Sequence, residues 1–151
     1  MKTIRNPRDR AELVRRLRTL TPQSTRRWGR MTSHQMVCHL CDLWRVAVGE
    51  RTTTPVGNPL AHTVIKWVML YTPVPPPKEV PTTPELDQEG GGTAPGEFAA
   101  DVETLIALME RSAAPSPPEP NDHPFFGQLS LDQWGRFNYK HMDHHLRQFG
   151  V

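Results

Sequence analysis

The chain has 151 residues, which is long enough for one domain, residues 1–151, with a core of its own. A hydrophobic fraction of 36%, 16 prolines and a net charge of +2 indicate a chain with much loop and no extreme charge. The start lacks the apolar region of a signal peptide, and the longest apolar stretch is too short to span a bilayer. We therefore expect a cytoplasmic protein that is not embedded in a membrane.

The first predicted helix covers residues 7–19 and ends before a Thr-Pro pair. Residues 1–30 hold ten Lys or Arg against two acidic residues, Asp9 and Glu12, a bias that suits nucleic-acid binding. The arginines, however, surround the leucine stripe of an amphipathic helix and have no aromatic stacking platform beside them. We therefore favour a solvated helix face and predict no nucleic-acid partner.

The second predicted helix covers residues 33–49 and opens with a capping box of Thr32 and Gln35. On its helical wheel His39 lies among apolar side chains and faces the core. His34 sits in the first turn and is expected to be exposed. His39 is therefore a candidate for chemistry inside the fold, and His34 is not.

The two cysteines, Cys38 and Cys41, have a CxxC spacing within this helix. Such a spacing occurs in redox sites and in zinc sites. Here both thiols lie away from the helix N-terminus, whose dipole would lower a thiol pKa, and on the other side of the wheel from His39. We favour packed or half-exposed thiols without a chemical role.

Two segments connect the second helix to the next long one. Residues 59–71 predict a shorter amphipathic helix, whose polar face is too weakly basic for a membrane-surface helix, so packing against the domain is favoured. Residues 72–93 are rich in proline and end near three consecutive glycines. We expect a long extended crossover rather than a linker between domains, because neither flank makes a self-sufficient core.

The next predicted helix covers residues 95–113 and is opened by Pro95. A proline-rich loop follows and leads to His123, which stands directly before Pro124. His123 could approach a metal ion. For a loop histidine before proline, we favour a structural hydrogen bond instead.

The last predicted helix begins with a capping box of Ser130 and Gln133 and runs to about residue 149, with Gly150 as its stop. At about 100° per residue, one apolar stripe carries both His141 and His145. His144 is displaced toward the boundary of this stripe and is not counted as a ligand. The same stripe carries Trp134, Asn138 and Gln148.

Two histidines one helical turn apart can reach a single ion, and an inward-facing His39 from another helix would complete a set of three. The alternative for His141 and His145 is a pair of core histidines that are hydrogen-bonded to protein groups. Three protein ligands leave a position open, as in catalytic sites, whereas structural zinc sites are usually closed by four. Neutral imidazole suits zinc, nickel, copper or iron, so the metal is not specified.

Three polar residues lie beside the histidines on their helical wheels and are candidates for hydrogen bonds that orient the ligands: Asp42, Asn138 and Gln148. No separate general base is evident, so the catalytic residues stay unknown. The fold class that follows is all-α. We expect a four-helix bundle with a long proline-rich crossover between its second and third helices, which run parallel, and an extra short helix.

The chain resembles the DinB/YfiT-like superfamily, and within it a subfamily without an assigned reaction. The similar stretches are HPFFG at residues 123–127, WG at 134–135, YKHMDHHLRQFGV at 139–151 and WGRMTSHQMVCHL at 28–40. The resemblance implies an up-down-down-up four-helix bundle, often dimeric. It also implies a site for nickel, zinc or a similar divalent ion on one histidine of the second helix and an HxxxH pair of the fourth. These positions are His39, His141 and His145 in this sequence.

Characterised members of that superfamily include transferases that use a low-molecular-weight thiol, bacillithiol or mycothiol, and a maleylpyruvate isomerase. The resemblance therefore implies a metal-dependent transferase or hydrolase acting on a small-molecule substrate, with a thiol as a candidate partner and a homodimer as the assembly. The alternative is a non-catalytic protein that binds metal or takes part in a stress-related interaction.

Overall fold

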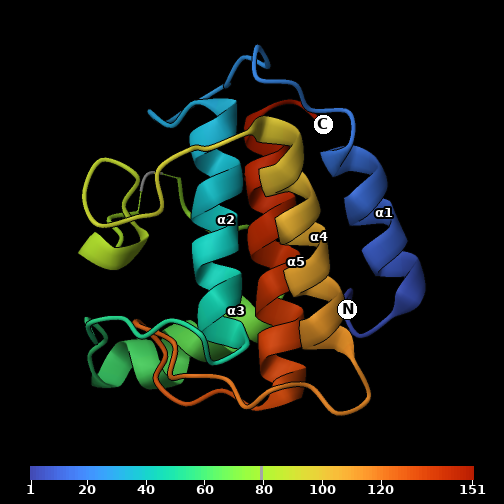
Figure 1. Ribbon diagram of the computed structural model, residues 1–151. Helices are drawn as coiled ribbons and strands as arrows, with labels where there is room; N and C mark the ends of the chain where they lie inside the picture. The colour runs from blue at the N-terminus through green and yellow to red at the C-terminus, as the bar shows by residue number, and fades with distance from the viewer. Residues whose placement is uncertain (79) are drawn as a thin grey trace.

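The computed structural model describes residues 1–78 and 80–151, and within these ranges all regular structure is helical. The all-α prediction is therefore confirmed. Helices α2 (Ser33–Ala47) and α5 (Leu131–Gln148) lie side by side, α4 (Phe98–Ala113) packs on α2, and α1 (Pro7–Leu17) packs on α5 (Figure 1). Followed along the chain, α2 and α4 run in one direction and α1 and α5 in the other.

Both predicted capping boxes are present. The Thr32 hydroxyl accepts the Gln35 backbone N–H at 3.1 Å, and the Gln35 side chain accepts the Thr32 N–H at 2.9 Å. Ser130 and Gln133 repeat the arrangement at the start of α5. Gly150, with φ of 80°, ends α5 in the left-handed region that glycine adopts without strain. These caps set the start of the two helices that carry the histidines.

Helix α4 begins at Phe98, three residues after Pro95, where the sequence predicted its start. Its N-cap is Glu97, whose carboxylate accepts the backbone N–H groups of Ala99 at 3.1 Å and Ala100 at 2.7 Å. Because these carboxylate bonds satisfy the first free N–H groups of the helix, the start falls at Phe98 rather than at Pro95. The ends of α1 and α2 each fall two residues before their predicted ends.

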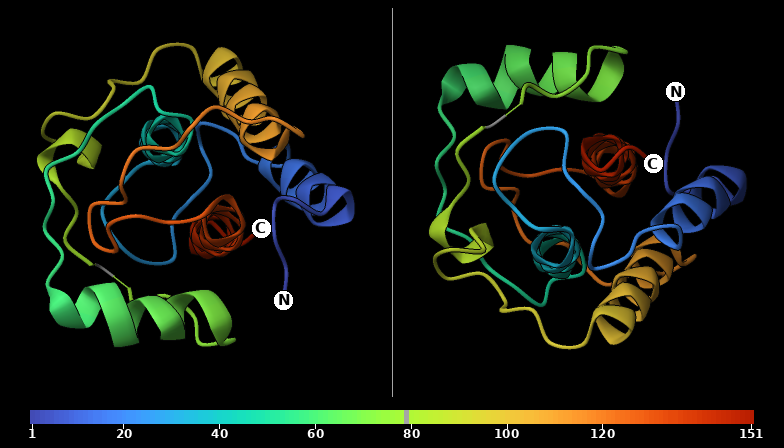
Figure 2. Two further views of the ribbon diagram at one scale, coloured as in Figure 1. Left: turned by 90° about the horizontal axis from the view of Figure 1, so that it is seen from below. Right: turned by 90° about the horizontal axis from the view of Figure 1, so that it is seen from above.

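The helical segment after α2 lies crosswise to α2 and α5 (Figure 2). It contains a π-helical stretch, η1 (Ala61–Ile65), followed by α3 (Lys66–Tyr71), which packs on α5. Lys140 of α5 holds the C-terminal end of α3, because its ammonium group donates to the carbonyls of Met69 and Thr72 at 2.8 and 3.0 Å. The predicted packing is only partly right, because Leu70 is fully buried whereas most other apolar side chains of the segment are exposed.

The crossover from α3 to α4 contains a short 3-10 helix, η2 (Pro84–Leu86), that lies against α2. Asp42 of α2 is fully buried and accepts bonds from the crossover: from the Thr93 N–H at 2.7 Å and from the Gln88 amide at 3.1 Å. Arg45 and Arg51 neutralise its charge at 3.0 and 2.5 Å. This buried carboxylate fixes the position of η2 relative to α2.

The main core lies between α1, α2, α4 and α5, and a second cluster of buried apolar side chains lies toward α3 and the loop before α5. Leu86 of η2 and Leu70 of α3 belong to the second cluster. The crossover and the crosswise helix are therefore packed parts of the fold.

Candidate metal centre

Three histidines from two helices meet inside the fold. His39 comes from α2, His141 and His145 come from α5, and their ligand nitrogens all lie within 4.8 Å of one another. The Nε2 atoms of His141 and His145 are 3.2 Å apart. This separation is close to the edge of about 3.3 Å that tetrahedral zinc with Zn–N bonds near 2.0–2.1 Å requires. The arrangement agrees with the inward faces predicted for both helices.

Hydrogen bonds on the far side of two rings determine which nitrogen faces the centre. His39 Nδ1 lies 2.9 Å from the Leu86 carbonyl oxygen, which only accepts, so Nδ1 carries the proton and Nε2 keeps its lone pair. His145 Nδ1 lies 2.9 Å from Gln148 Oε1, and the amide of Gln148 donates to the Trp28 carbonyl at 2.8 Å. Such partners fix the tautomer of a metal-binding histidine.

The three polar candidates have different roles. Gln148 contacts a histidine as expected. Asp42 instead holds the crossover, through the bonds described above, and makes no hydrogen bond to any of the three rings. Asn138 is 1% exposed, and both polar atoms of its amide have no hydrogen-bond partner in the described part of the chain. Buried amides are usually hydrogen-bonded, so a water molecule or a bound ligand would complete the bonding of Asn138.

The sequence did not reveal the backbone acceptor of His39. The Leu86 carbonyl lies 47 residues away from His39 in the chain. A backbone carbonyl is present in every residue, so the sequence does not show which one will accept a hydrogen bond. The Leu86 carbonyl reaches His39 because Asp42 holds the crossover against α2. The proline-rich composition of the segment predicted an extended course but not this contact.

Burial keeps all three rings neutral. It lowers the pKa of His39, and it lowers the pKa values of His141 and His145 well below their ordinary range, with the neighbouring histidines adding to the effect. A neutral imidazole has the free lone pair that a metal ion needs. The cluster is therefore suited to bind a metal cation, whereas burial disfavours protonation of its rings.

The remaining histidines of the second half of the chain lie outside the cluster. His144 is half-buried beside Trp28 and is not a member of the group of converging ligands, as the wheel predicted. His123 Nδ1 accepts the backbone N–H groups of Phe125 and Phe126 at 3.1 and 3.2 Å. It therefore makes the structural hydrogen bonds favoured above.

One expectation for the first helical turn of α2 is wrong. His34 is not exposed: its side chain is 18% accessible, its Nε2 lies 2.7 Å from Asp101 Oδ2, and its ring meets Phe98 edge to face. The reason is α4, which packs along this face of α2 and brings acidic and aromatic side chains against it. The free thiols of Cys38 and Cys41 are buried on the same face, as expected for packed cysteines.

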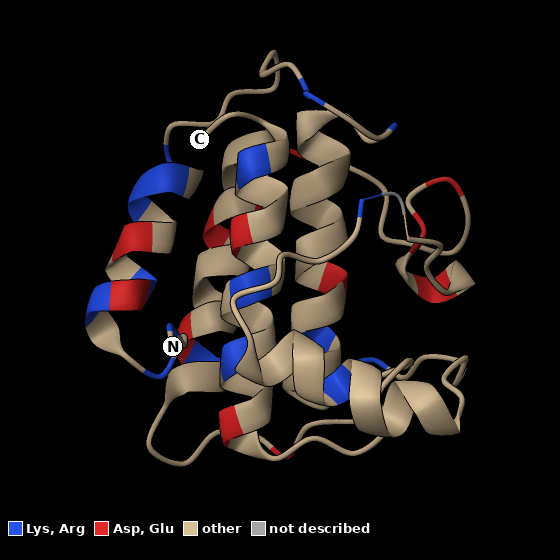
Figure 3. Ribbon diagram, turned by 180° about the vertical axis from the view of Figure 1, so that it is seen from behind, with Lys and Arg blue, Asp and Glu red and all other residues tan. Residues whose placement is uncertain are grey.

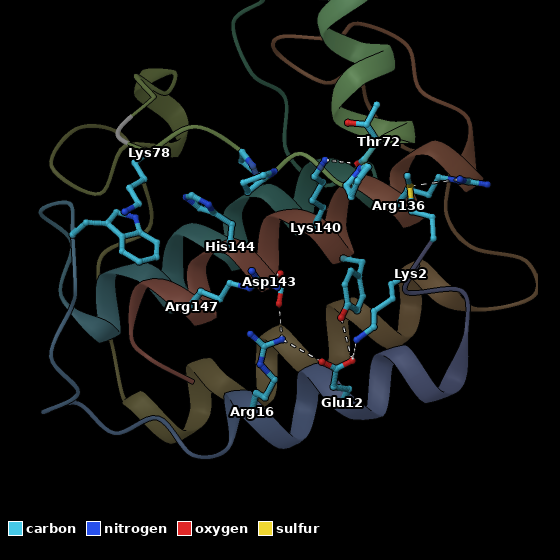
Figure 4. Close-up of a pocket in the computed structure, with 16 residues that line it drawn as sticks. Lys2, Glu12, Arg16, Thr72, Lys78, Arg136, Lys140, Asp143, His144 and Arg147 are labelled. Carbon is cyan, nitrogen blue, oxygen red and sulfur yellow. Dashed lines mark hydrogen bonds and ion pairs between the residues drawn. The ribbon is translucent and has the colours of Figure 1, made fainter.

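A groove of about 640 Å³ lies between α1, α5 and the segment after α3 (Figure 4). None of the three clustered histidines lines it, although His144 does, and the His144 ring is 5.3 Å from the His145 ring. Its basic lining residues are Lys2, Arg16, Lys78, Arg136, Lys140 and Arg147. Within the cluster His39 and His145 are buried, at 7% and 8% exposure, whereas His141 is partly exposed.

Several basic residues near the N-terminus are paired with acids. Arginines alternate with Asp9 and Glu12 along α1 (Figure 3), and ion pairs join Arg16 to Asp143 at 2.7 Å and Arg18 to Glu103 at 2.7 Å. The Arg18 and Glu103 side chains are more than half exposed, whereas the Arg16 side chain is only 13% accessible. Within residues 1–78 and 80–151, no helix has both the length and the apolar character needed to cross a membrane.

Comparison with known proteins gives a family without a described activity. A family described as protein of unknown function (DUF1569) matches residues 6–150. No curated protein and no solved structure is significantly similar to the chain. Because the match covers nearly the whole sequence, the chain belongs to the DUF1569 family.

Proposed function

We propose that this protein is a metal-dependent enzyme, with a divalent ion such as zinc or nickel held by His39, His141 and His145. The observation that carries the proposal is the convergence of three neutral imidazoles, two of them oriented by hydrogen bonds to their Nδ1 atoms. Nitrogen donors at these separations fit a transition-metal ion better than magnesium or calcium, which prefer oxygen.

We also propose that the chain is a member of the DinB/YfiT-like superfamily, with α1, α2, α4 and α5 as its up-down-down-up bundle. The directions of these helices in Figure 1 support the topology, and so does the long crossover between α2 and α4. The position of the three histidines, one on α2 and two on α5, matches the ligand pattern that the resemblance implies.

The reaction proposed is thiol transfer to a small electrophile, or hydrolysis of one. A bound divalent ion supplies Lewis acidity and lowers the pKa of a coordinated water or thiol. The protein's own residues orient the site. Gln148 and the Leu86 carbonyl fix two ligand rings, and Phe137 stacks on one face of the His141 ring with centroids 5.4 Å apart.

Asn138 is the group best suited to touch a substrate. It lies one helical turn before His141 on the same stripe, and its unpartnered amide offers one acceptor and two donors. A buried amide can hold the polar atoms of a small molecule in one orientation relative to the ligand rings. We therefore assign Asn138 a substrate-binding role rather than a structural one.

The alternative is a non-catalytic metal-binding or stress-related interaction protein. Its support is burial: two of the ligand rings are less than a tenth exposed, and the groove between α1 and α5 is not lined by any of the three histidines. Cobalt-loaded protein separates the two. An enzyme of the proposed kind binds added small thiols at the ion and changes its visible spectrum, whereas a closed structural site leaves the spectrum unchanged.

The first experiment is metal analysis of protein purified without a histidine tag, followed by thermal unfolding with added zinc or nickel. We expect bound metal and a raised Tm, because an ion that binds only the folded state stabilises it. If neither metal nor thermal shift is found, the proposed function is wrong.

We further propose a homodimer. Four apolar side chains at helical spacing form an exposed stripe along the crosswise segment: Leu60, Val64, Trp67 and Tyr71, which are 56%, 57%, 60% and 41% exposed. An apolar stripe of this kind on a surface helix typically packs against a partner. A second copy is the occupant that the dimeric superfamily implies.

A further inference from the structure

We propose a second metal site, for zinc or a similar borderline-soft ion, formed by His34, Cys38 and Asp101. It lies between α2 and α4, whereas the three-histidine cluster lies between α2 and α5. The two sites share no residue. This site does not depend on the proposed function of the histidine cluster, and either one can fail without the other.

The three side chains already converge. His34 and Cys38 are four residues apart on one face of α2, and Asp101 lies in the first turn of α4 opposite them. Asp101 Oδ2 is 2.7 Å from His34 Nε2 and 3.7 Å from Cys38 Sγ. In a tetrahedral zinc site, ligand atoms are separated by roughly 3.3–3.7 Å, so only small movements are required.

The donor set selects the class of ion. One imidazole nitrogen, one thiolate sulfur and one carboxylate oxygen form a borderline-soft set that favours zinc or cobalt over magnesium or calcium. Thiolate and carboxylate together carry two negative charges, which neutralise a divalent cation. The side chains of His34 and Asp101 are 18% and 25% accessible, so a water molecule can reach the fourth position.

The carboxylate and the imidazole are held in place. The Gly96 backbone N–H donates to Asp101 Oδ2 at 3.0 Å, and Phe98 packs edge to face on the His34 ring at 5.2 Å. An ion pair of His34 and Asp101 would account for two of the three groups. It does not account for a cysteine one helical turn further on with its sulfur directed at the same carboxylate oxygen.

Metal binding at this site releases a proton. Without metal, burial and the nearby Asp101 carboxylate raise the pKa of the Cys38 thiol to about 12, so the thiol is neutral and donates to Asp101. On binding, the S–H bond breaks, a metal–sulfur bond forms and the proton leaves to solvent. Because the thiol is held neutral, the same geometry argues against Cys38 as a nucleophile.

The test is a titration of the full-length, tag-free protein with Co²⁺, followed by absorption spectroscopy. Sulfur ligation gives an intense thiolate-to-cobalt charge-transfer band, which a site made only of histidines cannot give. We expect two ions per chain and this band. Cys38→Ser should lose the band and one ion, whereas His141→Ala should keep the band and lose the other ion.

The matched control is Cys41→Ser, because Cys41 is a second buried, free thiol on the same helix. It should keep two ions and the band. Asp101→Asn provides an independent variant if Cys38→Ser does not fold, and it should weaken binding of the sulfur-ligated ion at least tenfold. A wild-type protein without the band, or a band that survives in Cys38→Ser, would overturn the proposal.

Discussion

The Nδ1 atom of His145 lies 2.9 Å from Oε1 of Gln148, three residues further along the same helix. The opposite end of the amide donates to the Trp28 carbonyl at 2.8 Å. Because that carbonyl can only accept, the nitrogen of the amide must face Trp28 and its oxygen must face the ring. The segment before α2 thereby determines which nitrogen of His145 is free to bind an ion.

Replacing Gln148 should therefore weaken metal binding without removing a ligand. In Gln148→Leu the ring loses its orienting acceptor, and we expect zinc affinity to fall about 10–100-fold. Gln148→Glu keeps an acceptor toward Nδ1 and should retain most of the affinity. Competition titrations with a chromophoric chelator measure both. Equal affinity in the wild type and Gln148→Leu would show that the amide does not support the ligand.

The three clustered histidines should differ sharply from His144 in their effect on metal binding. His141→Ala or His145→Ala removes one of three nitrogens and should abolish tight binding at the cluster, as should His39→Ala. His144→Ala is the matched control, because it removes a neighbouring imidazole that points to the groove. Metal content after dialysis is the measurement. Equal losses at His144 would mean that the face of α5 is wrongly assigned.

Asp42 should contribute to stability rather than to metal chemistry directly. Its fully buried carboxylate accepts from Thr93 and Gln88 and is paired with Arg45 and Arg51. Asp42→Ala leaves buried donors and positive charge without a partner, so we expect a loss of about 3–5 kcal/mol in the free energy of unfolding. Urea denaturation measures it.

The control for that experiment is the surface pair Arg18–Glu103, whose side chains are 54% and 57% exposed. Glu103→Gln should change the free energy of unfolding by about 0–1 kcal/mol, because exposed ion pairs contribute little. Similar losses in both variants would contradict the assignment of Asp42 as the residue that holds the crossover.

Helical periodicity explains why much of the arrangement was predictable. The capping boxes of Thr32 and Ser130 define where α2 and α5 begin, and a period of 3.6 residues then determines which side chains face inward. This period predicts that His39 and the pair on α5 lie on inward faces. The single apolar stripe on each helix left little freedom for a different rotation.

Contacts between segments that are distant in the chain were not predictable in the same way. The bond from His39 to the Leu86 carbonyl depends on the course of the crossover, and the contact of His34 with Asp101 depends on how α2 and α4 are aligned along their axes. Neither relationship leaves a periodic signal. For the same reason the helical wheel makes Asp42 only a candidate partner of the histidines, whereas in the structure its carboxylate is bonded to the crossover.

The exposed stripe on the crosswise helix should mediate dimer formation. Trp67→Glu places a charge in the middle of the stripe, and we expect the protein to become monomeric in light-scattering measurements on a size-exclusion column. Val80→Glu changes a similarly exposed apolar side chain, 51% accessible, outside the stripe and should leave the assembly unchanged. A wild-type monomer at micromolar concentration would reject the proposed interface.

His123 should make the folded state sensitive to acid. Burial lowers its pKa from 6.5 to about 3, so the folded protein keeps the ring neutral while the unfolded chain takes up a proton below about pH 6.5. Between these values the unfolded state binds more protons, and stability falls as the pH falls; above pH 6.5 the effect vanishes. At pH 5 the loss of stability from this residue should reach about 2 kcal/mol.

The variant His123→Asn tests this effect, because it keeps an acceptor for the N–H groups of Phe125 and Phe126 and removes the titration. In urea denaturation with a chelator present, its loss of stability from pH 7 to pH 5 should therefore be smaller than that of the wild type by this amount. Because the metal-free histidines of the cluster titrate in both proteins, their contribution cancels in the comparison, and an identical pH dependence would show that His123 takes up its proton without unfolding.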